Sequence, residues 1–421
     1  MKDDASGISR WRPRSGRSEM MGAVGFFLNI QKAKVILHGP RWCSLPVEDY
    51  ELFGIPGAEV RLFCLQLEEK DMLFGAEDSL EKALSEAGIT SEDSLIIVIS
   101  HGTESLIGDD VDGICQRMGI YVPVISMEAG GFNRFYGEGW SRAFAYMAEA
   151  ASSEACISDN VPAFCLTGLD INDPYCQGDQ AEMVRMLSRA GLFVRKVSEA
   201  LGLLYGQIQD MRKAKGYIVL HQELAEEAVQ YIERHFGVPY VNAGVPYGVR
   251  QSLEWVRKVC CFCGIKPYMK DLEKEGEQIV REVYMRQSDI KGMFKSMVVK
   301  RIIVCGLSGT AIPLAEALRE LFPGAEFFLD IEENQNVGPF LFWDRFADGD
   351  HLDSGECQIL CGSEEDFSCL SGTGTILFVN LSSWNRRIHV QGMTLAGIRG
   401  WAWLTEFLFH ELYTAAQYRR G

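Results

Sequence analysis

Short apolar runs that alternate with amphipathic segments predict an α/β fold made of three Rossmann-like domains with doubly wound parallel sheets. The apolar runs are rich in Val, Ile and Phe and do not alternate with polar residues, which is typical of strands buried on both faces. The segments between them repeat apolar residues at helical spacing. Strands that alternate with helices form parallel sheets with right-handed crossovers.

The predicted strands fall into three groups along the 421-residue chain. In chain order they cover 33–39, 94–100, 120–126, 161–168, 192–197, 216–221, 301–306, 325–330, 357–362 and 375–381. Four of the predicted helices, DSLEKALSEAG, AEMVRMLSRAG, ELAEEAVQYIERHFG and AIPLAEALRELFPG, end in the Gly that favours a helix C-terminus. We therefore expect a basic tail over 1–18, domain I over 19–156, domain II with a charged helical connector over 157–298, and domain III over 299–421.

The composition narrows the classes of partner and compartment. The net charge of −17 disfavours general binding of nucleic acid or anionic membrane surfaces, which repel an acidic chain. Thirteen cysteines are an odd number and too sparse for a disulfide scaffold, which favours reduced thiols. The basic tail leads into no signal-peptide core, and the longest apolar runs are too short to span a membrane. We expect a cytoplasmic protein with neither nucleic-acid nor membrane partners.

Several motifs that define common enzyme classes do not occur. The sequence contains no GxGxxG after a strand, no GxxxxGK[ST], no HExxH, no GxSxG and no pair of CxxC knuckles. The turn CGLSGTA at Cys305 could offer backbone N–H groups to an anion, but a tight turn in an open sheet is the favoured interpretation. Asp109 and Asp110 could bind a metal or act as acid and base, but a cap for the helix starting at Val111 is favoured.

Cys43 is the cysteine best placed for function, because it follows a predicted strand in the turn HGPRWC. A thiolate there can point into a crevice and ligate iron, although composition alone favours a packed thiol. Cys260, Cys261 and Cys263 follow a helical segment, and adjacent residues on a helix point about 100° apart, so a packed helix end is favoured over a metal site. Packing is also the default for four cysteines in apolar, strand-like runs, namely Cys64, Cys165, Cys305 and Cys361.

Six segments, in order between about residues 20 and 411, resemble the nitrogenase component 1 family, which includes cofactor-assembly scaffolds and dark-operative protochlorophyllide reductase subunits. They are HGPRWC, LEEKDMLFGAEDSLEKAL, SHGTESLIGDD, AGGFNRFYGEGW, HFGVPYVNAGVPYGVRQSLEWV and WNRR…GMTLAGIRGWAWLTE. The last of these is similar to the ending of the second, β-type subunits. The resemblance implies domains around a central crevice, a homologous partner subunit, and electrons delivered by a separate iron-protein ATPase.

The sequence departs from the family pattern at the sites that bind clusters. The resemblance implies that Cys43 is a ligand, but Trp42 stands where glycine is usual and the LIGDD cysteine falls at Gly102. A [4Fe–4S] cluster needs about four ligands. Either a partner subunit shares the cluster or it is lost. The residues of the two matching turns that could contribute are His38, Gly39, Pro40, His101, Gly102 and Glu104.

The family's cofactor cysteine in the middle domain falls at His221. A histidine can ligate iron, but at a strand end it can also serve only hydrogen bonding. His389 is near the place of the second cofactor ligand, but its surroundings resemble β-type subunits, so that role is not carried over.

The resemblance thus implies a component 1 subunit, of either a reductase acting on a resistant bond or a cofactor-assembly scaffold. Its partner would be an α-type subunit or a second copy. Two alternatives remain open: a cluster-free paralogue that binds a small molecule or metallocofactor intermediate, and a homodimeric tetrapyrrole or C–S bond reductase. Fold does not fix the substrate.

Overall fold

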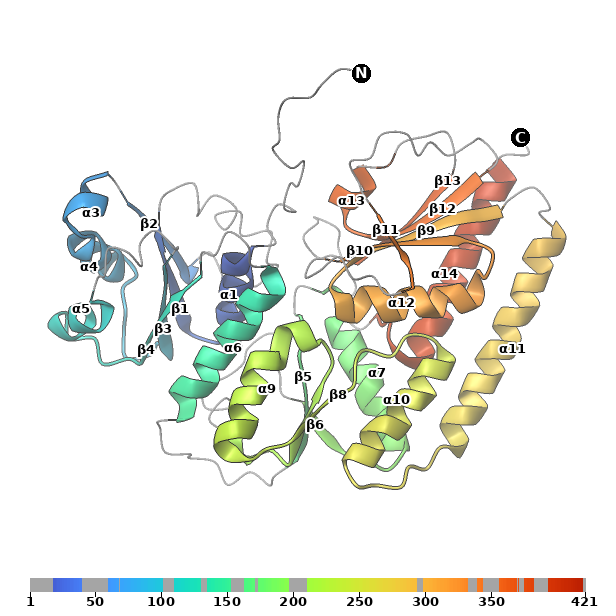
Figure 1. Cartoon of the computed structure of the whole chain (residues 1–421), viewed down its shortest axis with the longest axis horizontal. Coiled ribbons are helices and arrows are strands. Elements are labelled where there is room, and N and C mark those ends of the chain that lie inside the picture. Colours follow the sequence, from blue (N-terminus) through green and yellow to red (C-terminus); the bar gives the residue numbers. More distant parts are fainter. Residues whose placement is uncertain are drawn as a thin grey trace, which may run out of the picture.

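The computed structural model describes most of the chain, in segments. These are 18–39, 60–67, 69–100, 110–129, 135–152, 163–170, 173–196, 210–293, 298–331, 339–343, 356–368, 370, 375–381 and 393–418. Its strands form three separate parallel sheets, each flanked by helices (Figure 1). The predicted fold class, three Rossmann-like units with parallel sheets, is therefore confirmed. The domain boundaries remain predictions, and we refer below to the N-terminal, middle and C-terminal units by their sheets.

The N-terminal sheet has the order β2-β1-β3-β4 among the described strands. Its strands are β1 (Ala33–Gly39), β2 (Leu62–Gln66), β3 (Leu95–Ser100) and β4 (Val124–Glu128). The helices of this part are α1 (Glu19–Leu28), α3 (Glu69–Phe74), α4 (Glu77–Glu86), α5 (Val111–Arg117) and α6 (Tyr136–Ser152). Strand β4 begins later than the predicted residue 120 because Pro123, which has no N–H to donate, precedes it.

The middle sheet has the order β6-β5-β7-β8 in the described part of the chain. Its strands are β5 (Phe164–Thr167), β6 (Val194–Lys196), β7 (Gly216–Val219) and β8 (Tyr240–Asn242). The accompanying helices are α7 (Cys176–Arg189), the short 3-10 helix η4 (Asp210–Lys213), α9 (Gln222–Phe236), α10 (Val249–Phe262) and α11 (Lys270–Met293). Helix α11 is the predicted connector, and it packs against α10 and the C-terminal helix.

The C-terminal sheet has the order β11-β10-β9-β12-β13 among the strands described. They are β9 (Val298–Gly306), β10 (Glu326–Ile331), β11 (Leu341–Phe342), β12 (Glu356–Gly362) and β13 (Thr375–Asn380). The helices are α12 (Ser308–Leu321), α13 (Glu364–Ser368) and α14 (Gly397–Tyr418). Three short strands, β2, β8 and β11, lie outside the sequence-predicted set.

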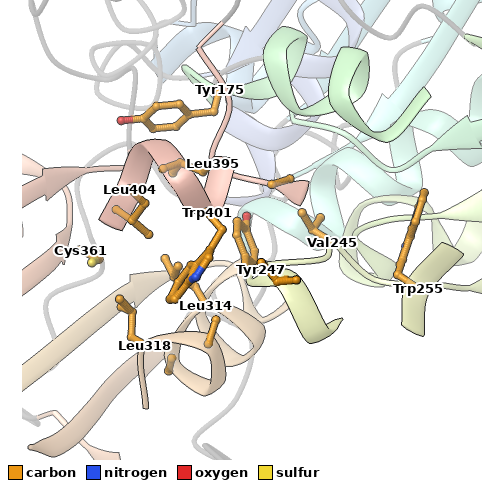
Figure 2. Packing of buried hydrophobic residues seen from close by; sticks show 14 of the residues in the cluster. Tyr175, Val245, Tyr247, Trp255, Leu314, Leu318, Cys361, Leu395, Trp401 and Leu404 are labelled. Carbon is orange, nitrogen blue, oxygen red and sulfur yellow. The ribbon is translucent and has the colours of Figure 1, made fainter. Parts of the chain in front are cut away.

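The two largest hydrophobic clusters of the described residues each join neighbouring units. One cluster joins α1, α6 and the N-terminal sheet to α9 and strands β5 and β7 of the middle unit. A second cluster joins α7 and α10 of the middle unit to α12, α14 and the C-terminal sheet. In Figure 2, Val245 and Tyr247 of the middle unit lie beside Leu314 of α12 and Trp401 of α14. Helix α14 thus packs against α7, α10 and α11 of the middle unit.

Each sheet has a switch point, the place where the strand order reverses and successive crossovers leave in opposite directions. The switch points lie between β1 and β3, between β5 and β7, and between β9 and β12. Ligands of open α/β sheets bind outside the carboxyl ends of the strands at such points. The three switch points are therefore the places where this fold favours a functional site.

Candidate functional site

The N-terminal switch point is formed by the strands that lead into both predicted cluster turns. Strand β1 ends at Gly39 and β3 ends at Ser100, and the two are hydrogen-bonded neighbours with His38 opposite Ser100. His38 is a buried residue of β1. The ends of the two strands thus lie side by side at the place where the fold favours a ligand.

The remaining residues predicted for this site lie outside the described residues. They are Pro40, Cys43, His101, Gly102 and Glu104. Their roles stay predictions, which rest on the two strand ends that precede them.

His221 lies two residues after the end of β7 in the middle sheet and occupies the N-cap position of α9. It is 2% exposed, and both ring nitrogens are within hydrogen-bond distance of a partner. Nδ1 lies 2.8 Å from the carbonyl oxygen of Gly168, at the end of β5. Nε2 lies 2.9 Å from the hydroxyl of Thr310, in α12 of the C-terminal unit. His221 therefore spans the middle switch point and the boundary with the next unit.

The partners of His221 constrain its protonation. A carbonyl oxygen only accepts, so Nδ1 carries a hydrogen and donates it to Gly168. In the neutral ring, Nε2 then accepts from the Thr310 hydroxyl. A metal-binding histidine commonly donates one ring N–H to a carbonyl in the same way and binds the metal through the other nitrogen. His221 has this orientation, with Thr310 at the position that a metal would take.

Glu223 places a carboxylate of the chain itself at the CGLSGTA turn, where the sequence left an external anion as the less favoured possibility. The amide of Gly309, in the first turn of α12, donates to Glu223 Oε1 over 2.8 Å. The N-terminus of a helix favours negative charge, which Glu223 supplies from the neighbouring unit. The CGLSGTA turn is thus a capped helix start at a boundary between units, in agreement with the favoured interpretation of a tight turn.

At this contact there is no room for a side chain on residue 309, so glycine is required. A Cβ added there would lie 2.7 Å from Cδ2 of His221 and 3.0 Å from Oε1 of Glu223. Gly137 of α6 is similarly close to Glu223, whose Cβ would be 3.3 Å from an added Cβ. Glu223 therefore lies where the N-terminal, middle and C-terminal units meet.

Asp179, in the first turn of α7, holds the start of α14. Its Oδ1 accepts from the hydroxyl of Thr394 over 2.7 Å and from the amides of Leu395 and Ala396 over 2.7 and 2.9 Å. Burial raises the pKa of Asp179 to about 6, while these hydrogen bonds and the charge of His221 act in the opposite direction. Asp179 is therefore a second polar link between the middle and C-terminal units.

Further acidic and phenolic groups surround Asp179. Burial raises the pKa of Asp173 well above its usual range, and the charges of Asp179 and Asp170 add to that effect. Burial also raises the pKa of Tyr247, with Asp179 contributing. Burial thus favours the protonated form of both carboxyls, Asp173 and Asp179.

Sequence reasoning identified His221 but missed Asp179, Glu223 and Thr310. Asp179 and Glu223 lie in amphipathic helices, where an acid at the first turn is ordinary. Nothing in the sequence indicates that their partners come from another unit. One feature of the sequence could have pointed to Glu223, namely its position two residues after the predicted site residue His221.

Asp110 is a helix cap, as the favoured interpretation predicted. Its Oδ1 accepts from the amide of Gly113 over 2.9 Å at the start of α5. Asp109 lies outside the described residues.

The described cysteines are mostly packed, and no described group of them forms a cluster site. Cys260 is buried, Cys261 is exposed and Cys263 is half-buried at the end of α10, as expected for residues pointing in different directions. Cys165, Cys305 and Cys361 are buried, whereas Cys64, predicted in the core, is only half-buried. Among the described residues, the one group of three metal-ligating side chains contains a single cysteine. A [4Fe–4S] cluster takes about four thiolates, so the described residues alone do not fit one.

Comparison with known proteins identifies similar families and structures. Residues 18–326 match the model of the nitrogenase component 1 type oxidoreductase family. A light-independent protochlorophyllide reductase subunit of Prochlorococcus marinus (strain MIT 9301) is 21% identical over 251 residues, which cover 57% of this chain and 48% of that protein. The nitrogenase iron-molybdenum cofactor biosynthesis protein NifE of Clostridium pasteurianum is 26% identical over 304 residues, covering 69% and 63%.

The solved structure titled "Nitrogenase Cp1 at pH 6.5" has a TM-score of 0.72 and 14% identity, covering 98% of this chain and 95% of that one. At this identity the likeness supports the fold alone. The chain spans about half the length of the protochlorophyllide reductase subunits that it matches. None of the described helices is both long and apolar enough to cross a membrane.

Proposed function

Because the chain belongs to the nitrogenase component 1 type oxidoreductase family, we propose that it is a subunit of a nitrogenase-like complex that accepts electrons from an iron-protein ATPase. Those electrons serve the reduction of a resistant bond or the assembly of a metallocofactor. The family match carries the proposal, and the three parallel sheets are consistent with it. The sequence has no P-loop motif, so ATP hydrolysis falls to the separate iron protein.

The proposed electron entry is an iron–sulfur cluster, of the [4Fe–4S] type, shared between subunits because only Cys43 falls at a ligand position of the family pattern. Cys43 would contribute one thiolate, from the turn after β1. An α-type subunit or a second copy of the chain would contribute the others. When bound, the cluster supplies single-electron transfer. The adjacent ends of β1 and β3, with His38 opposite Ser100, support the placement of this site.

His221 is the proposed residue of the cofactor crevice. Its Nδ1 hydrogen bond to Gly168 fixes the ring, and Nε2 is directed toward α12 at the boundary of two units. The chain has histidine where catalytic relatives place a cysteine, so reduction at a large iron–sulfur cofactor of its own is not part of the proposal. In the contact described above, His221 holds a hydrogen bond to Thr310 and orients the start of α12.

The test is anoxic co-expression with the neighbouring gene product, followed by measurement of iron content and the EPR signal of the purified complex. Cys43→Ala is expected to remove the cluster signal. Cys261→Ala is the matched control, since Cys261 is exposed on α10 and its loss leaves no cavity. Iron content unchanged in Cys43→Ala would show that Cys43 is not a ligand.

A cluster-free binding subunit is the second candidate function. The observation that favours it is the absence of a multi-cysteine group within the described residues. Colourless, iron-free protein recovered anoxically together with its partner would establish this alternative. Analytical ultracentrifugation distinguishes a third arrangement, the homodimeric reductase, from an obligate heteromer.

A further inference from the structure

Three metal-ligating side chains converge at the switch point of the C-terminal sheet. Cys305 is near the end of β9, Asp330 is near the end of β10, and Asp366 is in α13, which follows β12. The Sγ atom and one carboxylate oxygen of each aspartate all lie within 4.8 Å of one another. Strands β9 and β12 are the neighbours between which the strand order reverses. The group therefore lies where open α/β sheets bind ligands.

The group is largely enclosed. Cys305 and Asp366 are buried at 1% and 0% exposure, and Asp330 is half-buried. Cys305 packs with Ile303, Trp343 and Leu360 in a small apolar cluster of this unit. Gly362 lies tightly against the group, because a Cβ there would be 2.8 Å from Asp366 Oδ2 and 3.2 Å from Cys305 Cβ. This enclosure distinguishes the group from the acidic clusters that are common on protein surfaces.

Asp366 also has a structural task. Its Oδ2 accepts from the amide and hydroxyl of Ser363 over 2.8 and 2.9 Å, and its own amide donates to the Ser363 hydroxyl, which forms a reciprocal cap at the start of α13. The cap explains the orientation of Asp366, but not the approach of Cys305 and Asp330 from two other strands. A carboxylate has two oxygens and about four acceptor sites, so it can serve a cap and a metal together.

We propose that Cys305, Asp330 and Asp366 form a site for one divalent transition-metal ion, of which Zn²⁺ is the best match. A thiolate with two carboxylates favours Zn²⁺ over Mg²⁺ or Ca²⁺, which prefer oxygen ligands alone. Tetrahedral ligands held about 2.0–2.3 Å from one ion are about 3.3–3.8 Å apart. Ligand atoms that lie within 4.8 Å of one another therefore reach one ion after an inward movement of at most about 1.5 Å.

Binding through these residues has a defined charge balance. The Cys305 thiol loses its proton to solvent as the metal–sulfur bond forms, and no group is oxidised or reduced. The dication then offsets two of the three negative charges of the thiolate and the two carboxylates in a poorly hydrated place. Three protein ligands leave one tetrahedral position for water or another small ligand. The site is independent of the proposed electron-transfer function, because its residues lie in the C-terminal unit and do not include Cys43 or His221.

The test is titration of the full-length, chelator-treated chain with Co²⁺, a spectroscopic substitute for Zn²⁺. The wild type is expected to show a thiolate-to-cobalt charge-transfer band at one ion per chain, which excess Zn²⁺ abolishes. Cys305→Ser should remove the band. Cys361→Ser should retain it, since Cys361 is equally buried near the end of the adjacent strand β12 but is not part of the group.

Two further variants separate ligation from folding. Asp330→Asn leaves the α13 cap intact and should weaken Co²⁺ binding at least tenfold. Ser363→Ala breaks the cap while retaining Asp366, so it should keep most of the affinity if Asp366 acts as a ligand. A wild type without the band, or a band that survives in Cys305→Ser, would overturn the site. Neither result bears on iron bound through Cys43, so failure here and failure of the proposed function are distinguishable.

Discussion

The switch points of the middle and C-terminal sheets both carry polar side chains, but the two sets make different kinds of contact. At the middle switch point, His221, Glu223 and the nearby Asp179 bond to residues of the C-terminal unit. At the C-terminal switch point, Cys305, Asp330 and Asp366 approach one another within a single unit. The first set joins two units, whereas the second brings ligand atoms together.

The difference shows that a favoured position in the fold does not determine its use. Both places lie at the carboxyl ends of parallel strands, where backbone amides and short loops accommodate polar groups. The groups that contact the polar side chains determine whether a switch point serves structure or ligand binding. Amides from another unit turn a carboxylate into a structural link, as Asp179 shows with Leu395 and Ala396. The two carboxylates and the thiol that converge at the C-terminal switch point instead form the ligand set of the proposed metal site.

The largest effect is expected from Asp179→Ala. The change leaves the amides of Leu395 and Ala396 buried without their acceptor, and each such group costs about 1–3 kcal/mol. We expect a loss of about 3–5 kcal/mol in the free energy of unfolding, measured by denaturant titration. Asp78→Ala, at an exposed position in the first turn of α4, is the control and should change stability by less than about 0.5 kcal/mol. If the two variants lost equal stability, Asp179 would be no more important to the fold than an ordinary surface acid.

Asp179→Asn isolates the charge from the hydrogen bonds. Because burial raises the folded-state pKa of Asp179 to about 6, above its ordinary value, the folded chain binds the proton more tightly than the unfolded chain. The stabilisation from this group is therefore present below about pH 4 and is lost as the pH rises through about 6. Relative to Asp179→Asn, the wild type should lose on the order of 2–3 kcal/mol between pH 4 and 7.

Thermal unfolding of both proteins across this pH range measures the difference. Asp173 has its pKa raised partly by the charge of Asp179, so its titration moves toward the ordinary range in the variant. Parallel pH profiles for the two proteins would contradict an Asp179 that holds a proton in the folded state.

Gly309→Ala tests how closely α12 of the C-terminal unit approaches His221 and Glu223 of the middle unit. The added Cβ would meet Cδ2 of His221 at 2.7 Å, which forces a shift of the ring or of α12. Overpacking of this kind costs about 1–3 kcal/mol. Gly324→Ala is the matched control, since an added Cβ there meets nothing within 4 Å. Hydrogen exchange at the first turn of α12 should increase in Gly309→Ala alone. Equal protection of this turn in both variants would argue against close packing of α12 on the middle unit.

The sequence was sufficient for the architecture because the fold depends on local and periodic signals. The run AKVILHG matches β1 at both ends, and the Gly after ELAEEAVQYIERHF adopts the left-handed conformation that ends α9. Strand β11 has only two residues, Leu341 and Phe342, and is too short to produce a periodic pattern.

The candidate sites depend on contacts between distant segments, and a single sequence does not encode these in its spacing. His221 and Thr310 are 89 positions apart, and Asp179 and Leu395 are 216 apart. Cys305 was correctly predicted to be buried, but its two carboxylate neighbours come from segments that no motif connects to it. Family resemblance located His221, since it compares whole segments, but it gave no indication of the residues that hold the ring.

Thr310→Val is expected to have the smallest effect, and it is the most direct test of the His221 contact. Valine has nearly the shape of threonine but cannot bond to Nε2 of His221 or to the hydroxyl of Tyr247, so the change removes two hydrogen bonds and leaves the packing of α12 in place. We expect a loss of about 1–2 kcal/mol, below that of Asp179→Ala, because His221 keeps its bond to Gly168. The imidazole signals of His221 in NMR spectra should report the change at Nε2 and not at Nδ1. If Thr310→Val instead destabilises the chain as much as Asp179→Ala, the hydroxyl of Thr310 and not the carboxylate of Asp179 is the main polar link between the units.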